Sequence, residues 1–94
     1  MTYAAVTQSS TVDTSYNGWN NYETWLVNLW LTNDESSYYQ LAQILALYSD
    51  VVSQGDAIEE WVRADQAITT GLYADLINAA LGKVSWYEIA ENNQ

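Results

Sequence analysis

Apolar residues recur every three to four positions in five separate stretches of this chain, and no proline interrupts them. This spacing places apolar side chains along one face of an α-helix. Breaks with turn-forming residues separate the stretches, which run over about residues 22–31, 35–50, 57–68, 72–81 and 85–90. Five amphipathic helices with short connections predict an all-α fold, a compact bundle of about five short helices.

Local patterns predict where these helices begin and which side chains form the core. Asn21 is expected to cap the first helix, and residues 53–56 to form a break from which Asp56 caps the third. Ser85 and Glu88 have the spacing of a capping box for the last helix. The side chains expected to face the core are Tyr22, Trp25, Leu26, Leu29, Trp30, Tyr38, Leu41, Leu45, Tyr48, Ile58, Trp61, Val62, Leu72, Tyr73, Leu76, Ile77, Ala80 and Leu81.

The first fifteen residues differ from the rest. They are rich in Thr, Ser, Ala and Gln and have no helical period, so residues 1–15 are expected to form a flexible N-terminal tail. A chain of 94 residues has room for one core. Residues 16–94 are therefore expected to form a single helical domain.

The charge balance is strongly one-sided. Twelve Asp and Glu residues face only Arg63 and Lys83, which gives a formal net charge of −10. Such a chain repels nucleic acid phosphates and anionic membranes, and it attracts basic surfaces, of which proteins that bind DNA or RNA are the commonest source. The acidity either forms a binding face or serves only solubility.

The residue types that carry most enzyme chemistry are missing. The chain has no Cys and no His, which removes thiol nucleophiles, thiolate zinc sites and the usual general base. Its carboxylates lack the spacing of an EF-hand loop, so neither a metal nor a cofactor is expected. A small enzyme using a carboxylate pair remains the weakest alternative. No apolar run approaches a membrane span and no signal peptide is evident, so we expect a cytosolic, non-enzymatic protein.

Two kinds of side chain are candidates for partner binding. Carboxylates held on stiff helices could imitate the regular phosphates of a duplex; the candidates are Glu23, Asp34, Glu35, Asp56, Glu59, Glu60 and Asp65. Exposed aromatics such as Tyr38, Tyr39 or Tyr87 could add apolar contact as anchors. Trp19, in a glycine-containing turn, either folds over the core as a lid or anchors a partner.

Two segments carry a resemblance to a known group of proteins. Residues 17–31 read Asn-Gly-Trp-Asn-Asn-Tyr-Glu-Thr-Trp-Leu-Val-Asn-Leu-Trp-Leu, and residues 73–81 and 84–90 carry a second similarity. They resemble the short acidic proteins of phages, plasmids and other mobile elements that share an Asn-Tyr-Glu-Thr-Trp core. The resemblance implies a mobile-element protein and carries over no catalytic residue. Small acidic proteins of such elements often inhibit host defence, as antirestriction and anti-CRISPR proteins do.

The leading hypothesis is therefore an inhibitor of a host defence system, acting in the host cytosol. Its acidic, DNA-mimicking face would bind a basic nucleic-acid-binding protein or nuclease complex, without direct contact to nucleic acid or membrane. The alternative is a small interaction module that uses an aromatic surface, either as a monomer or as a homodimer.

Overall fold

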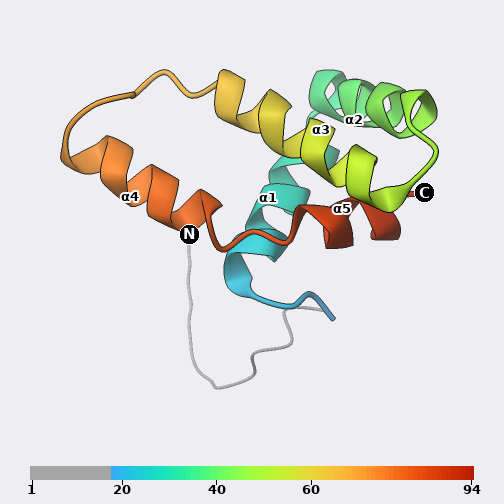
Figure 1. Cartoon of the computed structure of the whole chain (residues 1–94), viewed down its shortest axis with the longest axis horizontal. Coiled ribbons are helices and arrows are strands. Elements are labelled where there is room, and N and C mark those ends of the chain that lie inside the picture. The colour runs from blue at the N-terminus through green and yellow to red at the C-terminus, as the bar shows by residue number, and fades with distance from the viewer. Residues whose placement is uncertain (1–17) are drawn as a thin grey trace.

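The computed structural model describes residues 18–94, so the expected tail over residues 1–15 lies outside the described part. Five helices follow one another: α1 (Tyr22–Asn33), α2 (Glu35–Leu47), α3 (Val51–Ala64), α4 (Leu72–Leu81) and α5 (Trp86–Asn92). No strand occurs within residues 18–94. The all-α bundle of five short helices is confirmed (Figure 1).

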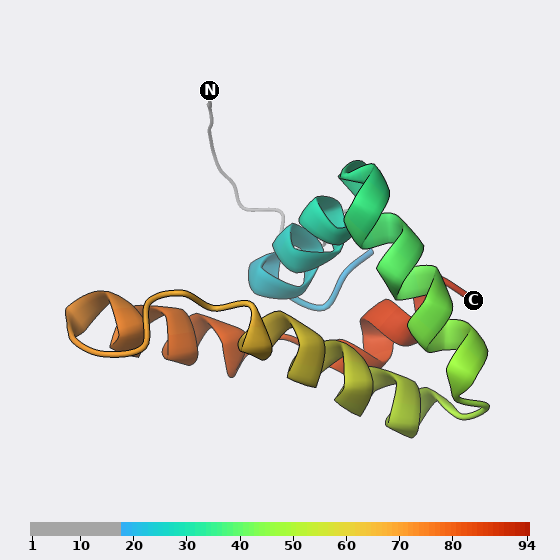
Figure 2. The ribbon, with the colours of Figure 1, turned by 90° about the horizontal axis from the view of Figure 1, so that it is seen from above.

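The bundle is built around the contact between α3 and α5, with α1 and α2 packed against them. Both views place α4 at one end of the molecule, beyond the other helices (Figures 1 and 2). The core draws on four helices and the turn before α5, and consists of Leu31, Leu41, Ile44, Ile58, Val84, Trp86, Ile89 and Ala90. Each fully buried Ile or Leu stabilises the fold by about 1.5–3 kcal/mol relative to an exposed one.

Three side chains cap helix N-termini. Asn21 accepts a hydrogen bond from the backbone N–H of Thr24 at 2.8 Å, which confirms the expected cap of α1. Asp34 caps α2 and Asp50 caps α3 in the same way. The backbone N–H of Ser37 donates to Asp34, and that of Ser53 donates to Asp50. Each bond lowers the pKa of its aspartate because it favours the charged form.

The expected break over residues 53–56 is wrong, because α3 runs unbroken from Val51 to Ala64. Gly55 lies within this helix, where it lets the ring and backbone of Tyr87 on α5 come close. Gln54 is buried, and its amide donates to the carbonyl oxygens of Leu45 and Tyr48 at the end of α2. The sequence read as a turn is therefore a helix–helix contact, and Asp56 is a helical residue and no cap.

The expected inner face of α1 is also wrong. Thr24 is fully buried and Leu31 is buried, with Val27 packed beside them, whereas Trp30 is 70% exposed. The spacing of Thr24, Val27 and Leu31 is helical, but one of the three is polar. The helix can turn this side inward because the Thr24 hydroxyl is fully hydrogen-bonded there.

Several other aromatic and apolar residues expected in the core are exposed. On α2, Leu41 and Ile44 are buried, but Tyr38 and Tyr48 are exposed. On α4, the small Ala74 is buried, whereas three expected core residues are exposed: Leu72, Tyr73 and Leu76. Tyr22 at the start of α1 is exposed as well. The periodic pattern thus located the helices and gave the inner side of α3, where Ile58 is buried and Trp61 and Val62 pack against the core, but it did not orient α1 or α4.

The capping box before α5 does not form. The side chain of Ser85 makes no capping hydrogen bond. The carboxylate of Glu88 instead accepts from the backbone N–H of Asn20 at 3.1 and 3.2 Å, across the molecule. Glu88 therefore ties the segment before α1 to α5.

Candidate partner-binding surfaces

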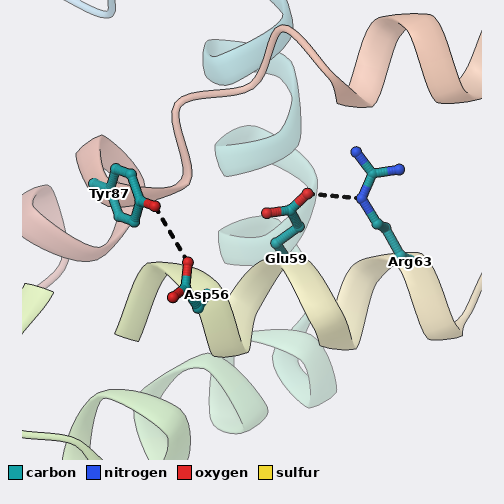
Figure 3. Close-up of polar contacts among 4 residues, drawn as sticks. All are labelled: Asp56, Glu59, Arg63 and Tyr87. Carbon is teal, nitrogen blue, oxygen red and sulfur yellow. Dashed lines mark hydrogen bonds and ion pairs between the residues drawn. The ribbon is translucent and has the colours of Figure 1, made fainter. Parts of the chain in front are cut away.

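The acidic side of α3 is the best-defined charged surface in the described chain. Asp56, Glu59 and Glu60, which we call the α3 acidic stripe, lie at helical spacing one turn apart. Figure 3 shows Asp56, Glu59 and Arg63 projecting from the same side of α3. The N-cap at Asp50 and the Gly55–Tyr87 contact fix the helix that carries them.

Two contacts position the stripe. The hydroxyl of Tyr87 donates to Oδ1 of Asp56 at 3.2 Å, and the negative charge of Asp56 raises the pKa of Tyr87 (Figure 3). Nε of Arg63 lies 2.8 Å from Oε2 of Glu59, and this is the only ion pair within residues 18–94. Arg63 therefore offsets one carboxylate of the stripe, while Asp56 and Glu60 keep their charge facing solvent.

A shallow hollow of about 240 Å³ lies beside the stripe. It is lined by Tyr48, Ser53, Asp56, Ala57 and Glu60. Two carboxylates and a tyrosine ring are suited to a lysine or arginine side chain, which carboxylates bind by charge-assisted hydrogen bonds and rings by cation–π contact. The sequence did not indicate the hollow, because Tyr48 was expected in the core.

The remaining acidic candidates are not gathered with the stripe. Glu23, in the first turn of α1, lines a different hollow between α1 and α4. Asp34 is occupied as the cap of α2, and Glu35 follows it. Asp65 is the C-cap residue of α3. The structure therefore brings together Asp56, Glu59 and Glu60, and places the other four on separate parts of the molecule.

Three exposed aromatic residues near the junction of α1 and α2 are the second candidate, which we call the aromatic corner: Trp30, Tyr38 and Tyr39. Trp30 at the end of α1 is 70% exposed, and Tyr39 on α2 is 66% exposed. Tyr38 is also exposed beside it in the sequence. The exposure of Trp30 was not predicted, because its spacing fits the apolar stripe expected to face the core. Trp19 is partly buried against the core, in the position of a lid.

The Asn-Tyr-Glu-Thr-Trp segment has a structural role. Oδ1 of Asn21 accepts from the hydroxyl of Thr24 at 2.7 Å, and that hydroxyl accepts from the backbone N–H of Ser85 at 2.8 Å. The amide of Asn21 donates to the carbonyl oxygen of Lys83 at 2.8 Å. These bonds connect the two segments that carry the resemblance. The motif therefore holds the start of α1 against the turn that precedes α5.

Within residues 18–94, no three carboxylates converge closely enough to hold a metal ion. No helix of this part is both long and apolar enough to cross a bilayer.

These features define a small acidic α-helical domain with a charged helix side and an exposed aromatic corner. The chain belongs to a family of unknown function, DUF7249, whose sequence profile matches residues 12–93. No curated protein and no solved structure is detectably similar to it.

Proposed function

We propose that this protein is a non-enzymatic inhibitor that binds a basic, nucleic-acid-binding protein. Its target class is a nuclease complex of a host defence system, of the kind that antirestriction and anti-CRISPR proteins of mobile elements block in the host cytosol. The resemblance of residues 17–31 and 73–90 to mobile-element proteins supports the biological setting.

The observation that carries the proposal is the α3 acidic stripe. Helix geometry holds the carboxylates of Asp56, Glu59 and Glu60 on a rigid support, as a duplex holds its phosphates. Preorganised charges lose little conformational freedom on binding, so more of their attraction to a basic groove remains as affinity. The net charge of −10 also speeds the approach to a positively charged surface.

The hollow next to the stripe supports a specific contact beyond general attraction. A lysine or arginine from the target would place its cation between Asp56 and Glu60 and its stem against Tyr48. An arginine that contacts DNA in the free target is suited to this, because a carboxylate accepts the same forked pair of bonds as a phosphate.

Capture from a host lysate tests the proposal. The tagged chain is washed at about 0.05 M and then about 1 M salt, between which the Debye length falls from over ~10 Å to ~3 Å. We expect a basic protein to be retained at low salt and released at high salt. Glu60→Lys should abolish its capture, because it reverses a charge that no basic residue offsets.

Asp65→Lys is the matched control, since it makes the same charge change at the C-cap of α3, outside the stripe, and should keep most of the binding. Circular dichroism of both variants verifies the helical fold. Equal capture by wild type and Glu60→Lys would refute the assignment of the stripe.

A second candidate function rests on the aromatic corner. A partner bound through Trp30 and Tyr39 would be held by apolar contact, since exposed aromatics of this kind anchor protein interfaces. This function predicts capture that survives high salt and is lost in Trp30→Ala or Tyr39→Ala.

A further inference from the structure

Helix α4 is the least supported helix of the bundle. The extensive helix–helix contacts join α3 to α5, α1 to α2, α2 to α3 and α1 to α5, and α4 takes part in none of them. Both views place it at one end of the molecule (Figures 1 and 2). Residues 67–73, which lead into the helix, are all exposed, as are most of its own side chains. Little buried surface therefore holds this segment in place.

The position of α4 depends on a small apolar contact with α1. Ala74 is buried, and Ile77 and Leu81 are partly buried. Ile77 and Leu81 line a small apolar hollow together with Leu26 and Val27 of α1. Within residues 18–94, no ion pair and no side-chain hydrogen bond links residues 67–82 to another helix. Apolar contact through these few side chains therefore keeps α4 against α1.

Helix α4 is also weak as a helix in its own right. It has 10 residues, and isolated helices shorter than roughly 12–15 residues are marginal in water. Its N-cap is Gly71, which makes no side-chain capping bond, whereas each of the first three helices begins with a side-chain cap. Such a helix is expected to unfold when it leaves its neighbour, so that undocking and unfolding form a single step.

The chain on either side of this segment is firmly held. Before it, Trp61 of α3 packs against the core. After it, the carbonyl oxygen of Lys83 accepts from the amide of Asn21, and the backbone N–H of Ser85 donates to the hydroxyl of Thr24. Opening of the segment can therefore stop at these two points and leave the rest of the bundle folded.

We propose that residues 67–82 form a lid that opens as one unit, with α4 unfolding as it leaves α1. Parts of a protein with few buried apolar contacts open at lower free energy than its core. Opening exposes the sides of Leu26 and Val27 that face the hollow. The α3 acidic stripe stays in place, because the contact between Gly55 and Tyr87 that supports it lies outside the lid. The lid is thus a conformational device separate from the proposed target site.

Native-state hydrogen exchange of the full chain, followed by NMR, tests the lid. The backbone N–H groups from Asp75 to Gly82 are the reporters, since that of Asp75 donates to Gly71 and that of Gly82 donates to Asn78. We expect their protection factors to be about 100-fold or more below those in the middle of α3, and to fall together as urea is added. Equal protection in α4 and α3 would overturn the lid, and protection in α4 that does not respond to urea would overturn its opening as one unit.

Three variants separate opening of the lid from unfolding of the whole chain. Ile77→Ala removes part of the contact with α1 and should lower protection in α4 about tenfold while leaving α3 unchanged. Leu76→Ala is the matched control, because Leu76 is 56% exposed and its loss should change protection by no more than about threefold. Ile58→Val in the core should lower protection in α3 and leave α4 unchanged. A fall of protection in both helices alike in Ile77→Ala would overturn the proposal.

Discussion

Gly55 offers the sharpest test of how α3 and α5 pack. A Cβ atom added at this position would lie 3.0 Å from Cε1 and 3.1 Å from the backbone N of Tyr87, with the ring Cδ1 closer still. A new rotamer could move the ring, but the backbone atom belongs to α5. In Gly55→Ala, α3 and α5 must therefore move apart, and these two helices make the most extensive helix–helix contact of the described chain.

The size of the effect follows from two opposing contributions. Overpacking of this kind costs about 1–3 kcal/mol, while alanine favours a helix over glycine by about 1 kcal/mol. Separation also weakens the exposed hydrogen bond from Tyr87 to Asp56. The net expectation is a loss of about 1–2 kcal/mol of unfolding free energy, or roughly 4–16 °C in Tm for a domain of this size.

Urea and thermal denaturation followed by circular dichroism measure this loss. Gly82→Ala is the control, because its Cβ would meet the carbonyl oxygens of Ala79 and Asn78 at 3.4 Å and its φ is −65°. That variant should stay within about 0.5 kcal/mol of wild type. A Gly55→Ala protein as stable as wild type would refute the close approach of α5.

Three further predictions concern single side chains. Thr24→Val should lower the unfolding free energy by about 1–3 kcal/mol in urea denaturation, because it leaves the Ser85 N–H without its acceptor, and Thr24→Ser should recover much of it. Trp30→Ala should change stability by no more than about 0.5 kcal/mol, whereas Trp86→Ala, in the core, should cost about 3–5 kcal/mol by the same measurement. Because backbone hydrogen bonds lower the pKa of Asp34 and Asp50, their stabilisation is present above the unfolded pKa of about 3.9 and is lost as pH falls through the lower folded values. The double variant Asp34→Asn, Asp50→Asn keeps both caps but removes both titrating groups, so its unfolding free energy should fall less as the pH drops. Denaturation curves recorded below about pH 5 measure this difference. An unfolding free energy that falls with pH as steeply as in wild type would contradict the role of these two carboxylates.

Local patterns were enough to predict the helices and the cap at Asn21, since caps and periodicity depend on neighbouring residues. They failed at residues 53–56, where Gly55 is set by contact with Tyr87, thirty-two positions further along the chain. They failed at Trp30 for a similar reason. The inward side of α1 is fixed by a bond between Thr24 and Ser85, and no periodicity reports a polar residue satisfied from a distant segment.

The candidate surfaces also differ in whether local sequence could predict them. Asp56, Glu59 and Glu60 share one helix, so their spacing alone predicted that they lie together. Glu23 and Asp34 belong to other elements, and only the tertiary arrangement could separate them from the stripe. The exposure of Leu72 and Leu76 on α4 was not predicted, because exposed leucines have the same pattern as buried ones.

Competition for the target most directly tests the idea that fixed carboxylates take the place of phosphates. Labelled nucleic acid is bound to the captured partner at low salt, and its fluorescence anisotropy is followed as this protein is added. Displacement by wild type but not by Glu60→Lys is the expected result. A stable complex in which the nucleic acid stays bound beside the protein would contradict it.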